Sequence, residues 1–252
     1  MLERTRKILF FTINDYWFDK ERYFNNKNNV SLLWTNEVLD KKKYNLKIPL
    51  KTVYIDLTKS IDDLFLDFKK KSCRYEIRKS LKLNFSFNIA NSDNEIKSTY
   101  NFFIDFCKKK KIPTPKFEEW KQMKIFYVKH EWEILSVWAF ISDDKNIIRY
   151  KHWGSSYKYS CMEYMIFEIM KYAKKEWYKI FDMWWINRGK YPAHYKFKTK
   201  FWWKEWVFFC YIKWNSFLIN FLLRFIDLFV KVFFQWNWNK FINFLNFLRI
   251  IK

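Results

Sequence analysis

Phe181-Asp182-Met183-Trp184-Trp185-Ile186 and Tyr195-Lys196-Phe197-Lys198-Thr199-Lys200-Phe201-Trp202-Trp203-Lys204 are the two segments that decide the fold of this chain. Each carries two adjacent tryptophans where the surrounding pattern calls for glycine. With glycine in those places, the first segment is a strand that opens into a tight loop, and the second is a helix that ends in a turn. The chain has 15 Trp and only 2 Gly in 252 residues, whereas an average glycine usage of about 7% would give roughly 18.

These counts lead to the hypothesis that the gene reads the codon UGA as glycine and that many tryptophans of the translated sequence stand for glycine. Codon bias in an AT-rich genome explains the scarce glycine but not the abundant tryptophan. A code that reads UGA as tryptophan would not direct tryptophan into turns. We therefore expect the suspect residues in loops or at element ends, some with positive φ. They are Trp153, Trp184, Trp185, Trp202, Trp203, Trp236 and Trp238.

The length and the charge set the first limits on function. A chain of 252 residues can bury a full core as one domain. Its formal net charge of +22 indicates an anionic partner such as tRNA, a phosphorylated cofactor or an acidic membrane. An AT-rich genome would also favour lysine codons and raise the charge without any such partner.

The cysteines and histidines argue against two kinds of site. The four cysteines form no Cys-x-x-Cys pair, and the three histidines lack ligand spacing. We therefore expect no metal site and no Cys-His nucleophile. The scattered cysteines and a beginning of the chain without the pattern of a signal peptide predict a cytoplasmic protein. The apolar helices expected at the end of the chain add the expectation of a peripheral position at the inner face of the membrane.

The order of apolar patterns predicts strands interleaved with helices. The expected strands are 6–13, 52–57, 85–89, 135–141, 147–152, 179–183 and 206–212. The expected helices begin at a capping box, Ser60 with Asp63, and continue at 74–82, 94–111, 117–129, 160–175 and 194–200. This order predicts an α/β (α+β) fold with a mixed, largely antiparallel sheet flanked by helices.

The last part of the chain differs in character. Residues 1–214 are expected to form the main domain, and 215–252 a C-terminal hairpin of two amphipathic helices. The apolar faces of these helices are wide enough to lie on a membrane surface, to form a homodimer or to cover the chain's own domain. Their charges argue against a transmembrane span.

Five short segments between about Lys51 and Trp214 together form an ordered set of motifs. They are Ile55-Asp56-Leu57-Thr58-Lys59, Arg74-Tyr75-Glu76-Ile77-Arg78-Lys79, His152-Trp153-Gly154-Ser155-Ser156, Phe181-Asp182-Met183-Trp184-Trp185-Ile186 and Tyr195-Lys196-Phe197-Lys198 leading to Phe201-Trp202-Trp203. With glycine restored, this order resembles the Fem (FemAB-like) family of peptidoglycan-bridge aminoacyl transferases, within the GNAT acyltransferase superfamily.

The resemblance implies an acyl or aminoacyl transferase that acts on an amine of a cell-envelope precursor of the peptidoglycan type. The donor would be aminoacyl-tRNA or acyl-CoA, with no tightly bound cofactor. In such a reaction an amine attacks an ester or thioester carbonyl and forms a tetrahedral oxyanion. The protein has to hold the reactants together and stabilise that oxyanion.

The resemblance also assigns the catalytic residues. Lys198, through its ammonium, and Phe197, through its backbone N–H, would face the oxyanion. Without the resemblance, Lys198 is one surface lysine among many. Asp182 would orient Lys198 or the acceptor amine, or simply cap the loop that follows it.

Residues for substrate binding follow from the same alignment of motifs. Arg74, Arg78 and Lys79 would lie near the acceptor's phosphates, unless they form a solvated helix face. The backbone N–H groups of Gly154-Ser155-Ser156 would reach a donor phosphate at the start of the next helix. Tyr195 belongs to the last motif and is assigned to substrate binding with it.

The chain departs from the family in one respect. Fem enzymes usually carry two GNAT-like halves, and this chain matches mainly the second, with only about 50 residues ahead of it. An alternative from another class is a non-catalytic, basic GNAT-like protein that binds tRNA or an anionic membrane.

Overall fold

The computed structural model describes residues 2–8, 11–18, 20–25, 30–35, 38–143, 146–159, 161–185, 192–201 and 204–214. The hairpin expected at 215–252 lies outside them. No helix of the described part is long and apolar enough to cross a membrane. The elements are β1 (Leu2–Ile8), β2 (Phe11–Trp17), α1 (Lys20–Asn25), β3 (Val30–Thr35), η1 (Lys41–Lys43), β4 (Leu46–Asp56), α2 (Ile61–Asp67), η2 (Lys70–Arg74), α3 (Tyr75–Leu81), β5 (Ser86–Ile89), α4 (Asp93–Lys110), α5 (Phe117–Lys121), β6 (Lys124–His130), β7 (Glu133–Ser142), β8 (Ile147–Ser155), α6 (Met162–Lys175), β9 (Ile180–Trp185), α7 (Pro192–Lys198) and β10 (Lys204–Trp214).

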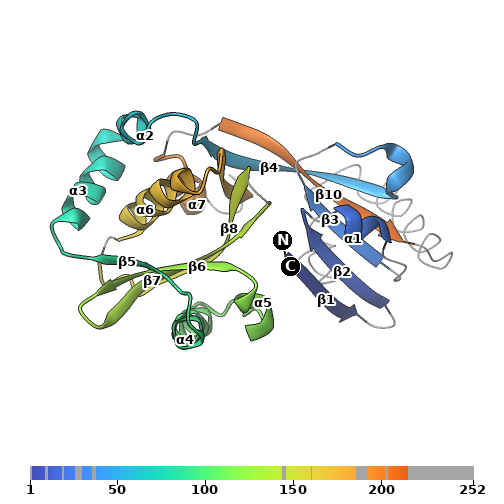
Figure 1. The fold of residues 1–252 in the computed structure, drawn as a ribbon, viewed down its shortest axis with the longest axis horizontal. Coiled ribbons are helices and arrows are strands. Elements are labelled where there is room, and N and C mark those ends of the chain that lie inside the picture. Colours follow the sequence, from blue (N-terminus) through green and yellow to red (C-terminus); the bar gives the residue numbers. More distant parts are fainter. Residues whose placement is uncertain are drawn as a thin grey trace.

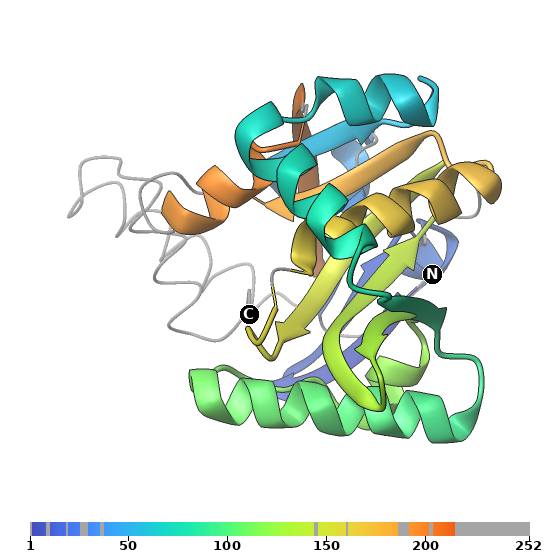
Figure 2. The same cartoon turned by 90° about the vertical axis from the view of Figure 1, so that its left-hand side faces the viewer.

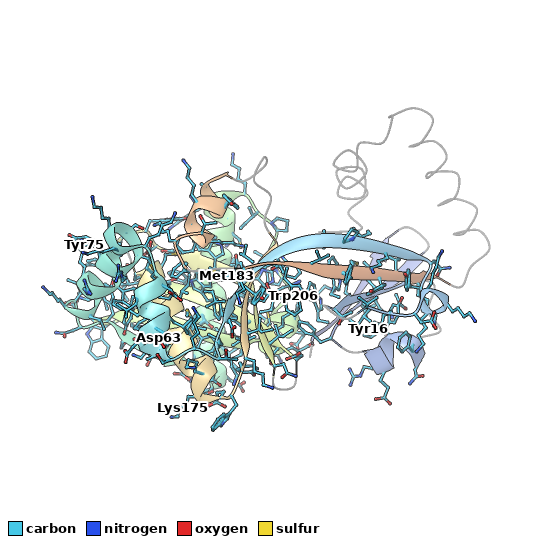
Figure 3. All side chains as sticks on the ribbon, turned by 90° about the horizontal axis from the view of Figure 1, so that it is seen from above. Tyr16, Asp63, Tyr75, Lys175, Met183 and Trp206 are labelled. Atoms are coloured by element: carbon cyan, nitrogen blue, oxygen red, sulfur yellow. The ribbon has the colours of Figure 1, made fainter. Side chains whose placement is uncertain are left out.

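The strands form one 10-stranded sheet in the order β1-β2-β3-β10-β4-β9-β8-β7-β6-β5 (Figure 1). Only the pairs β2–β3 and β8–β9 are parallel among the described strands. The predicted mixed, largely antiparallel sheet is therefore confirmed. Seen from above, the antiparallel pair β4 and β10 runs from the helix-covered part of the sheet to the N-terminal strands (Figure 3).

Helices cover both faces of the sheet from β5 to β9. Figure 2 shows α2 and α3, in teal, on one side and α4, in green, on the other. β7 serves both sides because side chains alternate along a strand: Trp138 and Phe140 enter the core beneath α3 and α6, whereas Val137, Ala139 and Ile141 enter the core against α4. The centre of the sheet is therefore buried on both faces.

Two helices begin where the sequence supplies a cap. The side chain of Ser60 accepts a hydrogen bond from the N–H of Asp63 at the start of α2, as predicted. Ser92 and Glu95 form a complete capping box at the start of α4, and Tyr127 donates a further hydrogen bond to Glu95. These caps satisfy N–H groups that the helices leave without intrahelical partners.

The prediction of one long helix over 117–129 is wrong. Helix α5 ends at Lys121, and residues from Lys124 form β6 instead. Ile125, Phe126, Tyr127 and Val128 are all buried. A strand buried on both faces gives a continuous apolar run, which does not distinguish it from a helix by periodicity.

The described tryptophans that were suspected of standing for glycine lie both within strands and at the ends of elements. Trp153 lies within β8 opposite Trp138, so the expectation of a loop is wrong there. Trp177 follows the end of α6 with φ 66° and is 84% exposed. Trp184 also has φ 66°, but its ring packs against Trp17 and Trp34. Trp185 ends β9, while Trp202, Trp203, Trp236 and Trp238 lie outside the described residues. Recoding itself stays a prediction.

Candidate active site

The candidate site is a cavity beside the point where the parallel strands β8 and β9 separate from each other. They pair only from Ile147 with Ile180 to Arg149 with Asp182. Beyond that point β8 stays paired with β7, and β9 stays paired with β4. A cavity of about 780 Å³ adjoins the point of separation.

Aromatic rings and cationic side chains line this cavity together. The rings are those of Phe103, Phe106, Trp138, Tyr150, Trp153, Tyr157, Tyr159 and Phe197. The cations are Lys110, Lys151 and Lys198. Such a lining suits a ligand with an apolar body and a negative or developing negative charge.

Lys198 is the last residue of α7 and, among the lysine side chains that the structure describes, the only one that is buried, with 7% of its surface exposed. Its Nζ donates a hydrogen bond to the carbonyl oxygen of Trp184 at 3.2 Å and lies 5.4 Å from the centre of the Tyr150 ring. Burial lowers the pKa of Lys198 to about 7, against a smaller opposing effect of the Asp182 charge. An amine of this kind can change protonation state near neutral pH.

Asp182 is fully buried behind the cavity wall, among fixed donors. Its Oδ2 accepts a hydrogen bond from Nε of Arg149 at 2.8 Å and forms an ion pair with Nη2 of the same side chain at 2.6 Å. Its Oδ1 accepts from the Thr52 hydroxyl and from the N–H of Trp184. The parallel register places Arg149 beside Asp182, which explains how a fully buried arginine finds its carboxylate.

Trp184 links Asp182 to Lys198 through its backbone. Its N–H donates to Asp182 at 2.7 Å, and its carbonyl accepts from Lys198. The pairing of β9 with β4 shifts register between Thr52 and Tyr54, opposite this segment. A bulge of this kind re-aims the backbone groups of a strand.

Two further residues of the α7 motif, Tyr195 and Phe197, are half-buried and pack against the core beneath α6. Of the two, Phe197 also lines the cavity. The N–H of Phe197 lies beyond the first four residues of α7, where N–H groups are used within the helix. The aromatic side chain of Phe197, rather than its N–H, is therefore the group suited to meet a ligand.

The basic residues expected to bind acceptor phosphates lie at the end of η2 (Arg74) and on α3 (Arg78 and Lys79), and they do not line this cavity. Arg78 and Lys79 are exposed, while Arg74 is half-buried. The guanidinium of Arg78 lies 5.4 Å from the centre of the Phe65 ring. The structure therefore does not bring these three residues together with Lys198.

Of Gly154, Ser155 and Ser156, only Ser155 lines the cavity. Gly154 lies in β8 beneath α4, where an added Cβ would stand 3.2 Å from Cγ of Phe106. The N–H of Ser156 donates to the carbonyl of Leu135. Close helix packing thus accounts for Gly154, and the Ser156 N–H is engaged within the sheet.

Two cationic residues of the site escaped sequence reasoning. Arg149 interrupts the apolar strand around Ile147 and Ile148, and a charge at such a place requires a buried partner. A charged residue within an apolar strand is the sequence feature that could have pointed to Arg149. Lys151 places its Nζ 3.6 Å from the centre of the Trp17 ring, a contact between distant strands that no local pattern reveals.

No family model matches the sequence, and no curated protein does. Solved structures do match. FemX superposes with a TM-score of 0.62 at 11% identity, over 82% of this chain and 83% of FemX. L-PGS from Bacillus licheniformis superposes with a TM-score of 0.58 at 13% identity, over 88% of this chain and 83% of that one.

A third structure is the C-terminal domain of a lysylphosphatidylglycerol synthetase from Agrobacterium fabrum. It has a TM-score of 0.59 at 10% identity, over 90% of this chain and 84% of that domain. Identities this low show a shared fold, and the fold agrees with the Fem and GNAT resemblance. These similarities give no support to the recoding of tryptophan.

Proposed function

We propose that this protein transfers an activated acyl or aminoacyl group onto an amine of a cell-envelope precursor. The observation that carries the proposal is the position of Lys198: a buried amine beside a large cavity, at the point where two parallel strands part. The fold shared with FemX and the lysylphosphatidylglycerol synthetase domains supports it. A lysine with a pKa near 7 in a cavity is itself typical of a functional site.

The reaction begins when the acceptor amine attacks the carbonyl carbon of the bound ester or thioester. A C–N bond forms, and the carbonyl oxygen becomes an oxyanion. Lys198, as an ammonium, donates a hydrogen bond to that oxygen. The intermediate then collapses, the bond to the leaving oxygen or sulfur breaks, and the proton lost by the amine passes to the leaving group. Fixed donors in a water-poor cavity typically contribute about 3–4 kcal/mol to such a step.

Asp182 and Phe197 act on either side of Lys198. Asp182 holds the backbone of Trp184, whose carbonyl binds the Lys198 amine. Phe197 forms part of the aromatic wall against which the apolar part of a substrate would pack. In this proposal Lys198 is the catalytic residue and Asp182 is a positioning residue.

The donor is aminoacyl-tRNA or acyl-CoA, and neither requires a tightly bound cofactor. Ser155, at the cavity wall, is the candidate to meet a donor phosphate. Arg74, Arg78 and Lys79 remain candidates for acceptor phosphates outside the cavity, where an extended acceptor could reach them. A peripheral position at the inner membrane face, contact through 217–252 and a homodimer remain parts of the proposal.

The proposal is tested by a mass-spectrometric search for acylated products. Purified protein is incubated in parallel with mixed aminoacyl-tRNA and with acyl-CoA, each with envelope precursors that carry a free amine. Transfer that depends on the protein supports the proposal. Binding of tRNA or anionic vesicles without any transferred group favours the non-catalytic alternative. The Lys175→Gln variant serves as a control for general loss of positive charge, because Lys175 is exposed and does not line the cavity.

A further inference from the structure

Arg149 is a fully buried cation that lies outside the cavity lining. Its Nε donates a hydrogen bond to one oxygen of Asp182, and its Nη2 forms an ion pair with the same oxygen, while the other carboxylate oxygen accepts from the Thr52 hydroxyl and the Trp184 N–H. Three hydrogen bonds and one ion-pair contact thus surround one carboxylate. The positive charge that balances Asp182 most directly is that of Arg149.

The uncharged backbone of Trp184 connects Lys198 to the same carboxylate. Its amine donates to the carbonyl of Trp184, whose N–H donates to Asp182. The Asp182 charge is felt at Lys198 and strengthens its hold on the proton. How strongly it does so depends on how much of that charge Arg149 already balances.

We propose that Arg149 is a positioning residue: it pairs with the Asp182 carboxylate and balances its negative charge, so that Lys198 can release its proton during the reaction. A lysine in a close ion pair holds its proton tightly, which makes it a poor donor to a leaving group. With Arg149 in place, the Lys198 ammonium can stabilise the oxyanion and then give its proton to the departing oxygen or sulfur, while the proton lost by the acceptor nitrogen passes to Lys198 and restores the ammonium. The functional meaning of this inference rests on the proposed transferase reaction.

Other charged or titratable groups share this cavity. They are Tyr150, Lys151 and His152 on β8, Glu163 at the start of α6, Lys110 on α4, and Tyr157 and Tyr159 in the turn before α6. Glu163 is balanced by Lys200 at 2.7 Å. Lys151 and Lys110 are positive and act on Lys198 in the same direction as Arg149. Asp182 is thus the carboxylate whose partner matters most.

The test measures the protonation of Lys198 without relying on activity. Protein with labelled lysine is followed by NMR from pH 5 to 11, and the Lys198 signal is assigned by its loss in Lys198→Met. We expect the wild type to titrate near pH 7. In Arg149→Gln we expect the midpoint to rise by about one pH unit or more, because an opposite charge nearby typically raises a lysine pKa by that amount. Arg78→Gln is the matched control and should leave the midpoint unchanged.

A midpoint that stays near pH 7 in folded Arg149→Gln overturns the proposal. If that variant does not fold, Thr52→Val gives the second test, because it removes one donor from Asp182 and keeps Arg149. Its Lys198 midpoint should also rise, by less than one pH unit, and an unchanged midpoint there overturns the proposal as well.

The activity profile separates this inference from the proposed function. If transfer occurs and depends on Lys198, its pH profile should move upward in Arg149→Gln together with the NMR midpoint. A midpoint that rises in a protein without transferase activity leaves the charge arrangement in place and refutes the transferase reaction. If transfer occurs but the Lys198 midpoint is unchanged in Arg149→Gln, the transferase reaction is supported and the role of Arg149 is refuted.

Discussion

Lys198 Nζ and the carbonyl oxygen of Trp184 are joined by a hydrogen bond of 3.2 Å, which ties the end of α7 to the end of β9. The two residues are 14 positions apart in the chain. Their contact brings the amine to the wall of the cavity that opens between β8 and β9. A buried lysine at such a place costs folding free energy, so its presence calls for a role in function.

Replacement of Lys198 by methionine should stabilise the protein near neutral pH. The pKa of Lys198 is about 7 in the folded state, below the ordinary value of 10.5. Below pH 7 the amine is charged in both states and the burial cost is fully present. Between pH 7 and 10.5 the unfolded chain binds more protons, so the wild type gains stability as the pH rises.

Urea unfolding at pH 6 should therefore show Lys198→Met more stable than the wild type by about 1–3 kcal/mol. The difference should shrink at pH 9.5. A variant that is less stable at pH 6 would mean that the amine contributes to folding.

The pH dependence of transfer should change when Lys198 becomes arginine. The wild type loses its ammonium as the pH rises through about 7, whereas a guanidinium stays charged. Deprotonation of the acceptor amine affects both proteins equally. The ratio of wild-type kcat/KM to that of Lys198→Arg should thus fall between pH 6 and 8.5, and a constant ratio would contradict the ammonium role.

Replacement of Trp177 by glycine should stabilise the protein by about 1 kcal/mol. Trp177 has φ 66°, and its N–H donates to Lys174 while that of Tyr178 donates to Ala173. This is the pattern that ends helices at glycine. Its ring is 84% exposed, so little packing is lost.

Thermal unfolding measures this effect, with Trp132→Gly as the control. Trp132 is 97% exposed but is not among the residues with positive φ. It should gain no stability from glycine. Equal effects at both positions would remove the backbone explanation. Inspection of the codons decides recoding separately, since UGG at these positions refutes it.

Replacement of Gly154 by alanine should destabilise the protein by about 1–3 kcal/mol. The new Cβ would stand 3.2 Å from Cγ of Phe106 and 3.3 Å from Cδ2 of Phe103, so α4 would have to shift from β8. Denaturant unfolding measures this cost. Ser156→Ala, at an exposed position, should be nearly neutral. A stable Gly154→Ala would argue that α4 yields easily.

The sequence predicts the class of fold because many of its signals are local. The Ser60 cap, the hairpin of β7 and β8 and the helix before Lys175 all arise from patterns within one segment. The strand expected at 6–13 is in fact two strands, β1 and β2. The strand β3 was missed, because its pairing with β2 and β10 comes from distant parts of the chain.

The site was predicted only in part for the same reason. Lys198 and Phe197 follow from a motif, and both line the cavity. Arg149 and Lys151 depend on register and on contacts with Asp182 and Trp17, which the sequence alone does not fix. Motif order grouped Arg74 of η2 and Arg78 and Lys79 of α3 with the site, although these residues do not line the cavity.

The central claim is that Lys198 takes part in acyl transfer rather than in holding the fold. The most direct measurement is the single-turnover rate of transfer by wild type and Lys198→Met, with substrate binding measured on the same samples. We expect the Lys198→Met rate to be reduced at least about 100-fold, as for loss of one oxyanion donor, in a variant that is folded and binds both substrates within a few-fold of the wild type. An unchanged rate in the folded variant would contradict it.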